Sequence, residues 1–268
     1  MAMLPTATTI TVLSQKGGTG KTTTVRSLAD VYRRIGLNVL CVDLDPQGNL
    51  SDYFDVPADA SPTVADVLAG QARAVDAIHE GVLPANLGLA ESELILGGKM
   101  GRELTLRRAL RDVKRQHDLI LVDCPPSLGL LTVNALVAAD HALISSEAEY
   151  FSLQGVEQAL EVVELAKESL HPELDWLGVV LNIADMRLVH AREALEQLKD
   201  RFGDKLLTSV IRRSVRYAES AERGVSIIDY APDLGADYLA LAEELLERLG
   251  YAEERERVAA LRSELVPA

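Results

Sequence analysis

Directly after the apolar run Ile10-Thr11-Val12-Leu13-Ser14 and Gln15, the chain reads Lys16-Gly17-Gly18-Thr19-Gly20-Lys21-Thr22-Thr23. Glycines in such a loop let backbone N–H groups approach phosphate oxygens without a side chain in the way. Gly20-Lys21-Thr22 supplies the end of the G-x-x-x-x-G-K-[ST] pattern, but Gln15 stands where the first glycine is usual. The stretch therefore predicts a variant phosphate-binding loop with a second lysine near its start.

The positions of this loop have separate expected roles. Lys21 is expected to reach the β- and γ-phosphates of a nucleotide, and the Thr22 hydroxyl to bind Mg²⁺. A helix beginning near Lys21 would point the positive end of its dipole at the phosphates. Lys16 is surplus to one site, so its ammonium either folds back on its own nucleotide or reaches the nucleotide of a facing subunit. A glycine-rich turn with two solvated lysines is disfavoured, because the strand, loop and helix signals agree.

Two further apolar strands end in carboxylates. Val39-Leu40-Cys41-Val42 leads into Asp43 and Asp45, which share one face because successive strand residues point to opposite faces. Leu119-Ile120-Leu121-Val122 leads into Asp123, the expected Mg²⁺-holding residue at the carboxyl end of a parallel strand. Of the first pair, one carboxylate would orient the attacking water and the other would hold the metal shell or the loop. Alternatively both only cap the next turn, which Asp-Pro favours.

Apolar strands and helical segments alternate along the chain. This pattern predicts a single doubly wound α/β domain, with a mostly parallel sheet flanked by helices. The length of 268 residues and the 48% hydrophobic content suit one such domain. Strands are expected near 9–14, 38–43, 87–90, 118–122, 141–145, 176–182 and 206–211. Helices are expected near 21–35, 63–69, 101–115, 129–138, 152–169, 188–201, 216–222, 234–249 and 252–263.

Several motifs together resemble the ParA/MinD family of deviant Walker-type P-loop ATPases, and most of all its ParA (Soj-like) partition branch. The resemblance implies a ParA-type ATPase domain over 1–250 and a C-terminal helical extension over 251–268. The matching stretches are KGGTGKTTT at 16–24, VDLDPQGNLS at 42–51, DLILVDCPPSLGLLTVNAL at 118–136, EYFSLQG at 149–155, FGDK at 202–205, SVRYAES at 214–220 and GADYLALAEEL at 235–245.

The resemblance assigns roles to individual residues. It implies that Lys16 reaches across a sandwich homodimer to the partner's nucleotide, and that Lys16, Lys21 and Asp45 are catalytic, with Asp45 orienting water. It implies that Thr22, Asp43 and Asp123 form the metal region. Asn182 corresponds to an adenine-binding Asn of some relatives, although an Asn that only caps a turn is an equal alternative. The expected nucleotide contacts are Lys16, Gly17, Gly18, Thr19, Gly20, Lys21, Thr22, Thr23 and Asn182.

The resemblance also implies a function: hydrolysis of ATP, with ATP and Mg²⁺ as cofactors. ATP would favour a homodimer that binds double-stranded DNA without sequence preference, while a ParB-like or cargo-adaptor protein stimulates turnover, in the partition of a chromosome or plasmid. Protein cargo on the nucleoid, a MinD-like membrane cycle and a metabolic relative such as a ligase are the alternatives. Ile211-Arg212-Arg213-Ser214 departs from the common Ile-Pro-Arg-Asn, which leaves the contacts of the base and the cargo open.

The net charge of −14 argues against DNA binding unless basic residues gather locally. In the family, arginines at the positions of Arg187 and Arg216 line a DNA-facing surface, and Arg212 and Arg213 would strengthen it. The alternative is that these arginines are solvated helix and loop charges. The predicted DNA-binding residues are Arg187, Arg212, Arg213 and Arg216.

Composition predicts where the protein acts. The sequence has no apolar run of about 18 residues, no secretory pattern in Met1–Thr9 and no basic amphipathic C-terminus, so we expect a cytoplasmic, nucleoid-associated protein without a membrane partner. Cys41 and Cys124 are not spaced as a metal site, and the five histidines are scattered.

Overall fold

Seven parallel strands form one sheet in the computed structural model, which describes residues 6–149 and 151–265. The sheet order is β3-β2-β4-β1-β5-β6-β7, so the predicted single, doubly wound α/β domain is confirmed. Parts of the expectations for Met1–Thr9, for the motif containing Tyr150 and for the extension over 251–268 lie outside the described residues. The strands are β1 (Thr8–Leu13), β2 (Val39–Asp43), β3 (Val82–Leu83), β4 (Leu119–Asp123), β5 (His141–Glu147), β6 (Asp175–Ala184) and β7 (Leu206–Arg212).

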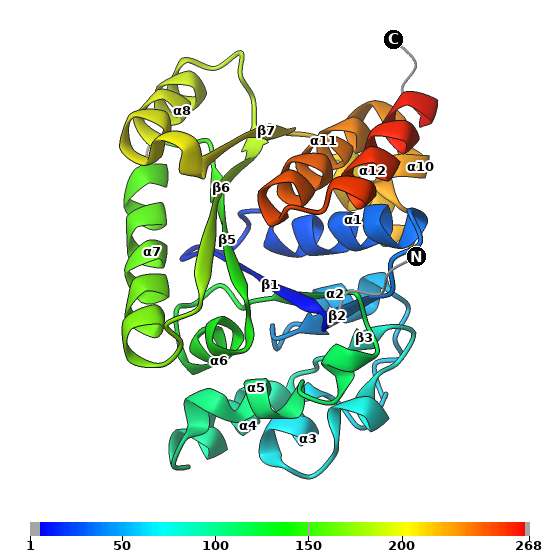
Figure 1. Ribbon diagram of the computed structural model, residues 1–268, viewed down its shortest axis with the longest axis vertical. Helices are drawn as coiled ribbons and strands as arrows, with labels where there is room; N and C mark the ends of the chain where they lie inside the picture. Colours follow the sequence, from blue (N-terminus) through cyan, green and yellow to red (C-terminus); the bar gives the residue numbers. More distant parts are fainter. Residues whose placement is uncertain (1–5, 150, 266–268) are drawn as a thin grey trace.

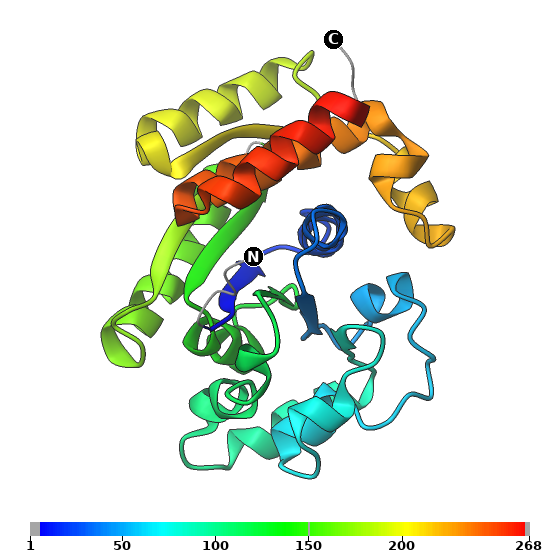
Figure 2. The same ribbon diagram turned by 45° about the vertical axis from the view of Figure 1, so that its right-hand side comes forward.

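Helices cover both faces of this sheet, and Figures 1 and 2 show the two layers. On one face α1, α11 and α12 pack around Tyr32 and Tyr238, which are fully buried. On the other face α3 to α8 enclose a second apolar cluster. The helices are α1 (Lys21–Arg34), α2 (Asn49–Tyr53), α3 (Val64–Ala69), α4 (Gly88–Gly97), α5 (Thr105–Ala109), α6 (Leu130–Ala138), α7 (Ser152–Ser169), α8 (Val189–Phe202), α9 (Arg216–Glu222), α10 (Ile227–Tyr230), α11 (Pro232–Leu249) and α12 (Ala252–Leu265), with 3₁₀ turns η1 (Ala74–Ala77), η2 (Arg102–Leu104), η3 (Val113–Arg115) and η4 (Gly203–Lys205).

The region between β2 and β4 differs from the sequence-based expectation. The predicted strand near 87–90 is wrong: the edge strand is β3, and helix α4 begins at Gly88. The burial of Leu89, Ser92 and Leu96 follows a helical spacing of three and four residues, which the short Leu-Gly-Leu-Ala stretch alone does not reveal. The helix expected over 101–115 is divided into η2, α5 and η3. The short helices α2 and α10 had no counterpart in the prediction.

The strand register brings the acidic residues together. Asp43 is the direct partner of Asp123 across β2 and β4, and Val12 of β1 is paired with Asp123 on its other side. β2 and β4 are buried along their whole length, as expected for parallel strands covered on both faces. The phosphate-binding loop and both carboxylates therefore meet at the carboxyl edge of the sheet, where ligands of such folds bind.

The C-terminal helix α12 packs along α11. Val258 is fully buried in the α1/α11 layer, and Arg255 and Arg262 both form ion pairs with Glu243 of α11. The described part of the C-terminal segment is therefore docked on the body of the protein. No helix within the described ranges combines the length and the apolar character needed to cross a membrane.

Candidate functional site

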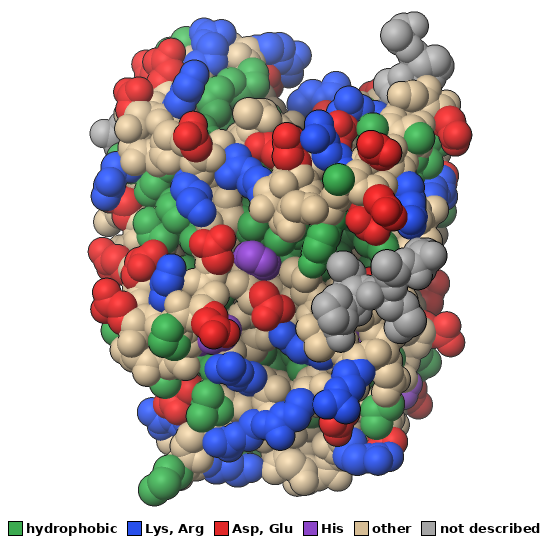
Figure 3. Space-filling model, viewed as in Figure 1, with side chains coloured by type: hydrophobic (Ala, Val, Ile, Leu, Met, Phe, Trp, Pro, Cys, Tyr) green, Lys and Arg blue, Asp and Glu red, His purple; other side chains and the backbone are tan. Residues whose placement is uncertain are grey.

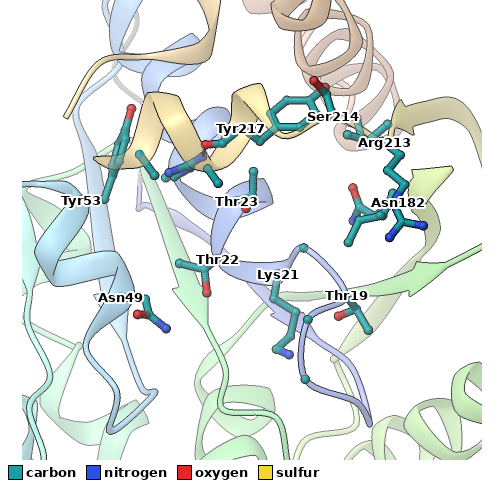
Figure 4. Close-up of a pocket in the computed structure, with 18 of the residues that line it drawn as sticks. Thr19, Lys21, Thr22, Thr23, Asn49, Tyr53, Asn182, Arg213, Ser214 and Tyr217 are labelled. Atoms are coloured by element: carbon teal, nitrogen blue, oxygen red, sulfur yellow. Dashed lines mark hydrogen bonds between the residues drawn. The ribbon is translucent and has the colours of Figure 1, made fainter. Parts of the chain in front are cut away.

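A cavity of about 860 Å³ opens at the carboxyl edge of the sheet. Its walls come from the loop at 17–23, the Asp45 loop, the end of β6 and the β7–α9 segment at 211–218. Figure 4 shows Thr22 and Lys21 on the α1 side of this space, with Asn182 and Arg213 beside each other on the β6/β7 side. The cavity therefore joins the two sequence regions that were predicted to hold phosphate and to bind DNA.

The loop that follows β1 depends on glycine. Gly18 and Gly20 have φ of +77° and +81°, a region that side chains rarely adopt. A Cβ on Gly20 would also lie 3.2 Å from the side-chain carbon Cγ of Asn182. Gly20 is the N-cap of α1 and provides no side-chain cap, so the first N–H groups of the helix stay available to a phosphate.

Lys21 lies buried against its own loop. Its Nζ donates to Ser14 Oγ at 3.2 Å and to the Lys16 carbonyl oxygen at 3.1 Å. Burial lowers the pKa of Lys21, while the nearby Asp123 carboxylate acts in the opposite direction. The ammonium has three donors, so it can contact a phosphate without giving up every contact with the loop.

Thr22 and Asp123 have the chemistry of a magnesium site. Thr22 Oγ1 donates to Asp123 Oδ2 at 2.6 Å, which joins the start of α1 to the end of β4. Asp123 is 1% exposed, and its Oδ1 has no hydrogen-bond partner among the described residues. Burial, and then the Asp43 carboxylate, raise the pKa of Asp123. A buried carboxylate oxygen without a partner is costly, and Mg²⁺ prefers oxygen ligands, so this pair fits a divalent cation.

Asp43 is committed to the following loop. Its Oδ1 accepts from the backbone N–H of Asp45, and its Oδ2 accepts from both the N–H and the hydroxyl of Ser51, at 2.8 to 3.0 Å. The same Ser51 hydroxyl accepts from the backbone N–H of Ala85. Burial raises the pKa of Asp43 to about 6. These contacts place Asp43 as the anchor of the Asp45 loop, with both oxygens already used.

Asp45 and Lys16 are placed differently from Asp43. Asp45 lines the cavity, and its Oδ1 accepts from the Gln47 N–H at 3.0 Å, which is the turn-capping contact considered from the sequence. Lys16 is exposed and does not line the cavity; its Nζ lies 5.6 Å from the centre of the Phe151 ring. Lys16 is thus outside the residues that line the nucleotide cavity of its own subunit.

A buried hydrogen-bond chain supports the loop from β5 and β6. Asn182 Nδ2 donates to Ser145 Oγ at 2.7 Å, and Ser145 Oγ donates to the Thr19 carbonyl oxygen at 2.6 Å. Asn182 lies inside β6, so the turn-capping interpretation is wrong. Ser145 was missed by the sequence analysis, although a serine within an apolar strand is a signal of such a role.

Arg26 is a second residue that the sequence did not reveal. It is 5% exposed, donates to the Tyr217 carbonyl oxygen at 2.5 Å, and its guanidinium lies 4.7 Å from the centre of the Tyr53 ring. Arg26 therefore ties α1 to α2 and α9, the elements that form one wall of the cavity.

The predicted DNA-binding arginines lie in two adjacent turns. Arg212 is paired in register with Ala184, so the β7–α9 turn runs beside the β6–α8 turn that carries Arg187. Three of the four are in ion pairs with acids, whereas Arg213 makes no ion pair within the described ranges and lines the cavity. The pairs are Arg187 with Asp185, Arg212 with Asp237 and Arg216 with Asp233.

Known proteins that are similar to this chain include nucleotide-binding ATPases. A family model described as "AAA domain" matches residues 7–176. The chromosome-partitioning ATPase Soj of Thermus thermophilus is 40% identical over 90% of this chain and 96% of its own. Cobyrinic acid a,c-diamide synthase of Mycobacterium smegmatis, solved with ADP and magnesium, is 35% identical with a TM-score of 0.74, over 81% of this chain and 93% of its own. The septum site-determining protein MinD of Pyrococcus horikoshii, solved with Mg-ADP, has a TM-score of 0.74 at 26% identity, over 91% of this chain and 98% of its own. The chain therefore belongs to the ParA/MinD family of P-loop ATPases.

Proposed function

We propose that this protein is an ATP-dependent switch that binds DNA without sequence preference as a homodimer and positions a chromosome or plasmid. The observation that carries the ATP part is the pair formed by Thr22 and Asp123: one buried oxygen of Asp123 has no hydrogen-bond partner in the described part of the chain, and it suits Mg²⁺ beside the phosphate loop. The solved relatives hold ADP and magnesium, and Soj of Thermus thermophilus is a chromosome-partitioning ATPase.

Each residue around the cavity would have a separate role in ATP hydrolysis. The loop N–H groups and Lys21 would bind the phosphates, and Thr22 with Asp123 would hold Mg²⁺, which neutralises charge on the phosphates when bound. Asp45 would orient the attacking water from the cavity wall. Asp43, through Ser51, would fix the loop that carries Asp45. Asn182 would contact the base side of the nucleotide while supporting Thr19 through Ser145.

The homodimer is proposed on the position of Lys16. Its ammonium lies outside the cavity of its own subunit, so in a face-to-face dimer it is free to reach the γ-phosphate held by the partner. Hydrolysis and release of the phosphate would then remove the charged group that each lysine contacts across the interface, and the interface would weaken. A ParB-like or cargo-adaptor protein would accelerate that step, and the protein would be cytoplasmic and nucleoid-associated.

DNA would meet the surface formed by Arg187, Arg212, Arg213 and Arg216. Pairing two subunits doubles the phosphate contacts on this surface, so binding through it in the range of ~10⁻⁴ to 10⁻⁶ M at physiological salt is expected for the dimer and not for the single subunit. Within each subunit the acids compete with DNA for three of these arginines. The ATP dimer therefore has to bring enough phosphate contacts together to displace them.

A membrane cycle of the MinD type is less favoured. It requires an amphipathic helix that is free to enter the lipid interface. Here α12 is docked on α11, with Val258 buried and both Arg255 and Arg262 paired to Glu243. A metabolic role like that of the Mycobacterium smegmatis synthase would require a substrate site beyond the nucleotide, and a metal-insertion role would require metal ligands. The described residues hold no cluster of three or more His, Cys, Asp and Glu suited to a metal ion, which disfavours the metal-insertion role. Protein cargo in place of DNA cargo stays an alternative, to be decided by the identity of the partner.

The test is the mass of the protein in each nucleotide state, measured by light scattering together with retention of an arbitrary labelled duplex. We expect a dimer and DNA retention with ATP, both prolonged by Asp45→Ala, and neither with ADP to a comparable degree. In Lys16→Ala the dimer and the increase in DNA retention on adding ATP should both be lost while ATP binding persists. A Lys16→Ala protein that dimerises normally would refute the cross-subunit role, and DNA retention that ATP does not increase would refute the switch.

A further inference from the structure

Four arginines on and beside α5, away from the β7 edge of the sheet, belong neither to the nucleotide cavity nor to the Arg187–Arg216 surface. Arg107, Arg108, Arg111 and Arg115 all have exposed side chains, and none forms an ion pair with any residue that the structure describes. They lie on α5, η3 and the turn between them. We call these four residues the arginine row.

The charge around the arginine row contrasts with that of the chain. Residues 99–115 contain seven Lys and Arg but only two acids, Glu103 and Asp112, in a protein with a net charge of −14. Glu103 is already paired with Arg102. The space-filling view shows a band of Lys and Arg across the end of the molecule where α4 and α5 lie (Figures 1 and 3). A positive surface of this strength on an acidic protein attracts a polyanion locally.

The backbone arranges these side chains in a line. Bonds from Leu110 N to Leu106 O and from Lys114 N to Leu110 O continue the helical pattern across the break between α5 and η3. At about 1.5 Å per residue, arginines four positions apart recur every ~6 Å along the helix. Leu106, Leu110 and Val113 are fully buried on the other side, so the guanidinium groups project from a fixed ridge.

The two neighbouring lysines, unlike the arginine row, are already held by contacts within the protein. Lys99 Nζ donates to the Ala69 carbonyl oxygen at 2.9 Å, and Lys114 pairs with Asp140 at 3.0 Å. Between Arg107 and Arg115, all described, no large hydrophobic side chain is exposed, whereas Leu94 and Ile95 of α4 and Met100 in the following turn are exposed. The test below therefore measures binding to lipid vesicles beside binding to DNA. What remains is a ridge of guanidinium groups, whose forked donors match phosphate oxygens.

We propose that the arginine row is a second contact surface for duplex DNA, which engages the phosphate backbone independently of bound nucleotide. α5 packs on α6 and α3, away from the β7 edge that carries Arg212, so one subunit would present two separate DNA-facing surfaces (Figure 1). Such a subunit can hold one DNA segment weakly at all times and add a second contact in the ATP dimer. The choice of DNA as the polyanion rests on the proposed function.

The test compares Arg107→Gln/Arg111→Gln with Arg73→Gln/Arg201→Gln, a charge-matched control on two exposed arginines that are paired with acids. Fluorescence anisotropy with an arbitrary duplex is measured across salt, without nucleotide and with ATP. Losing two phosphate contacts should make the slope of log K against log[salt] shallower by about 1.8 without nucleotide, at ~0.9 per contact. The gain in affinity on adding ATP should persist, and the control should match the wild type.

Three outcomes overturn the inference: a slope equal to that of the control, no binding by the wild type without nucleotide even at low salt, or a loss of binding to phosphatidylserine vesicles in place of DNA. Unchanged ATP affinity and an unchanged thermal midpoint show that the variant is folded. The proposed function fails in a different way: the wild type would then gain no affinity with ATP, whatever the row variants do.

Discussion

The nucleotide cavity and the Arg187–Arg216 surface share the carboxyl edge of the sheet but differ in how their charges are held. In the cavity, hydrogen bonds place Lys21, Thr22 and Asp43, and one buried oxygen of Asp123 is left without a partner among the described residues. On the surface, three of the four arginines are already paired with acids. One subunit thus has its ATP-binding groups in place, whereas its DNA-facing charge is largely satisfied within the subunit.

This difference teaches that a count of basic residues does not measure the charge offered to a partner. Exposed ion pairs are worth about 0–1 kcal/mol each, so DNA phosphates can displace the acids, but only where several contacts act together. A dimer supplies twice the contacts of a monomer. We therefore expect the nucleotide state to control DNA binding by this surface, although each single subunit already carries all four arginines.

The largest effect is expected for Asp45→Ala. If Asp45 orients the attacking water, the turnover number should fall by about 10²–10⁴-fold. ATP affinity should change little, because Asp45 makes no hydrogen bond to Lys21 or Thr22. Steady-state phosphate release and binding of a fluorescent ATP analogue measure the two quantities, with the exposed Asp59→Ala as control. Normal turnover in Asp45→Ala would remove this residue from the mechanism.

Next comes Lys21→Ala, which tests the cavity side of the comparison. Charge-assisted hydrogen bonds contribute about 1.5–3 kcal/mol, so the Kd for ATP should rise by roughly 10–100-fold. Titration calorimetry measures this change, with the exposed Lys199→Ala on α8 as the matched lysine control. An affinity like that of the control would mean that the Lys21 ammonium stays on Ser14 and the Lys16 carbonyl when ATP binds.

A smaller effect is expected for Arg216→Ala on the DNA side. Each dimer would lose two phosphate contacts, so the salt slope with ATP should become shallower by about 1.8. ATP turnover without DNA should be unchanged. The control is Arg201→Ala, an exposed arginine paired with Glu157. A slope that matches the control would take Arg216 off the DNA surface and leave it as the partner of Asp233.

The smallest expected effect is an increase in DNA affinity in the variant Asp233→Asn. This change removes the acid that competes for Arg216, while the Asp233 backbone carbonyl that accepts from Arg212 remains. Since an exposed pair is worth up to about 1 kcal/mol, DNA affinity with ATP should rise by roughly two- to fivefold per subunit. Asp59→Asn controls for the change of net charge. Equal gains in both variants would show that only the overall charge matters.

Local patterns revealed the parts of the site that are contiguous in sequence. The phosphate loop, the strand ends at Asp43 and Asp123, and most helices could be predicted because periodicity and glycine placement are local signals. The edge strand and α4 were mistaken, since four residues cannot distinguish a short strand from a helix start.

The supporting contacts could not be predicted from the sequence. The links from Asn182 to Ser145 and Thr19, and from Arg26 to Tyr217, join residues that are far apart along the chain. The ion pairs that neutralise Arg212 and Arg216 likewise depend on how α11 packs beside β7 and α9. Only tertiary structure sets such pairings, so the sequence located the arginines but not the charge they offer.

The most direct test of the switch is the salt dependence of DNA binding by Asp45→Ala, with ATP and with ADP on the same samples. Because ATP should pair two arginine surfaces, the account predicts a steeper slope of log K against log[salt] with ATP than with ADP. The steeper slope should appear at the protein concentrations where light scattering finds the dimer. Equal slopes in the two nucleotide states, at concentrations where the dimer forms, would contradict the claim that ATP controls the DNA-facing charge.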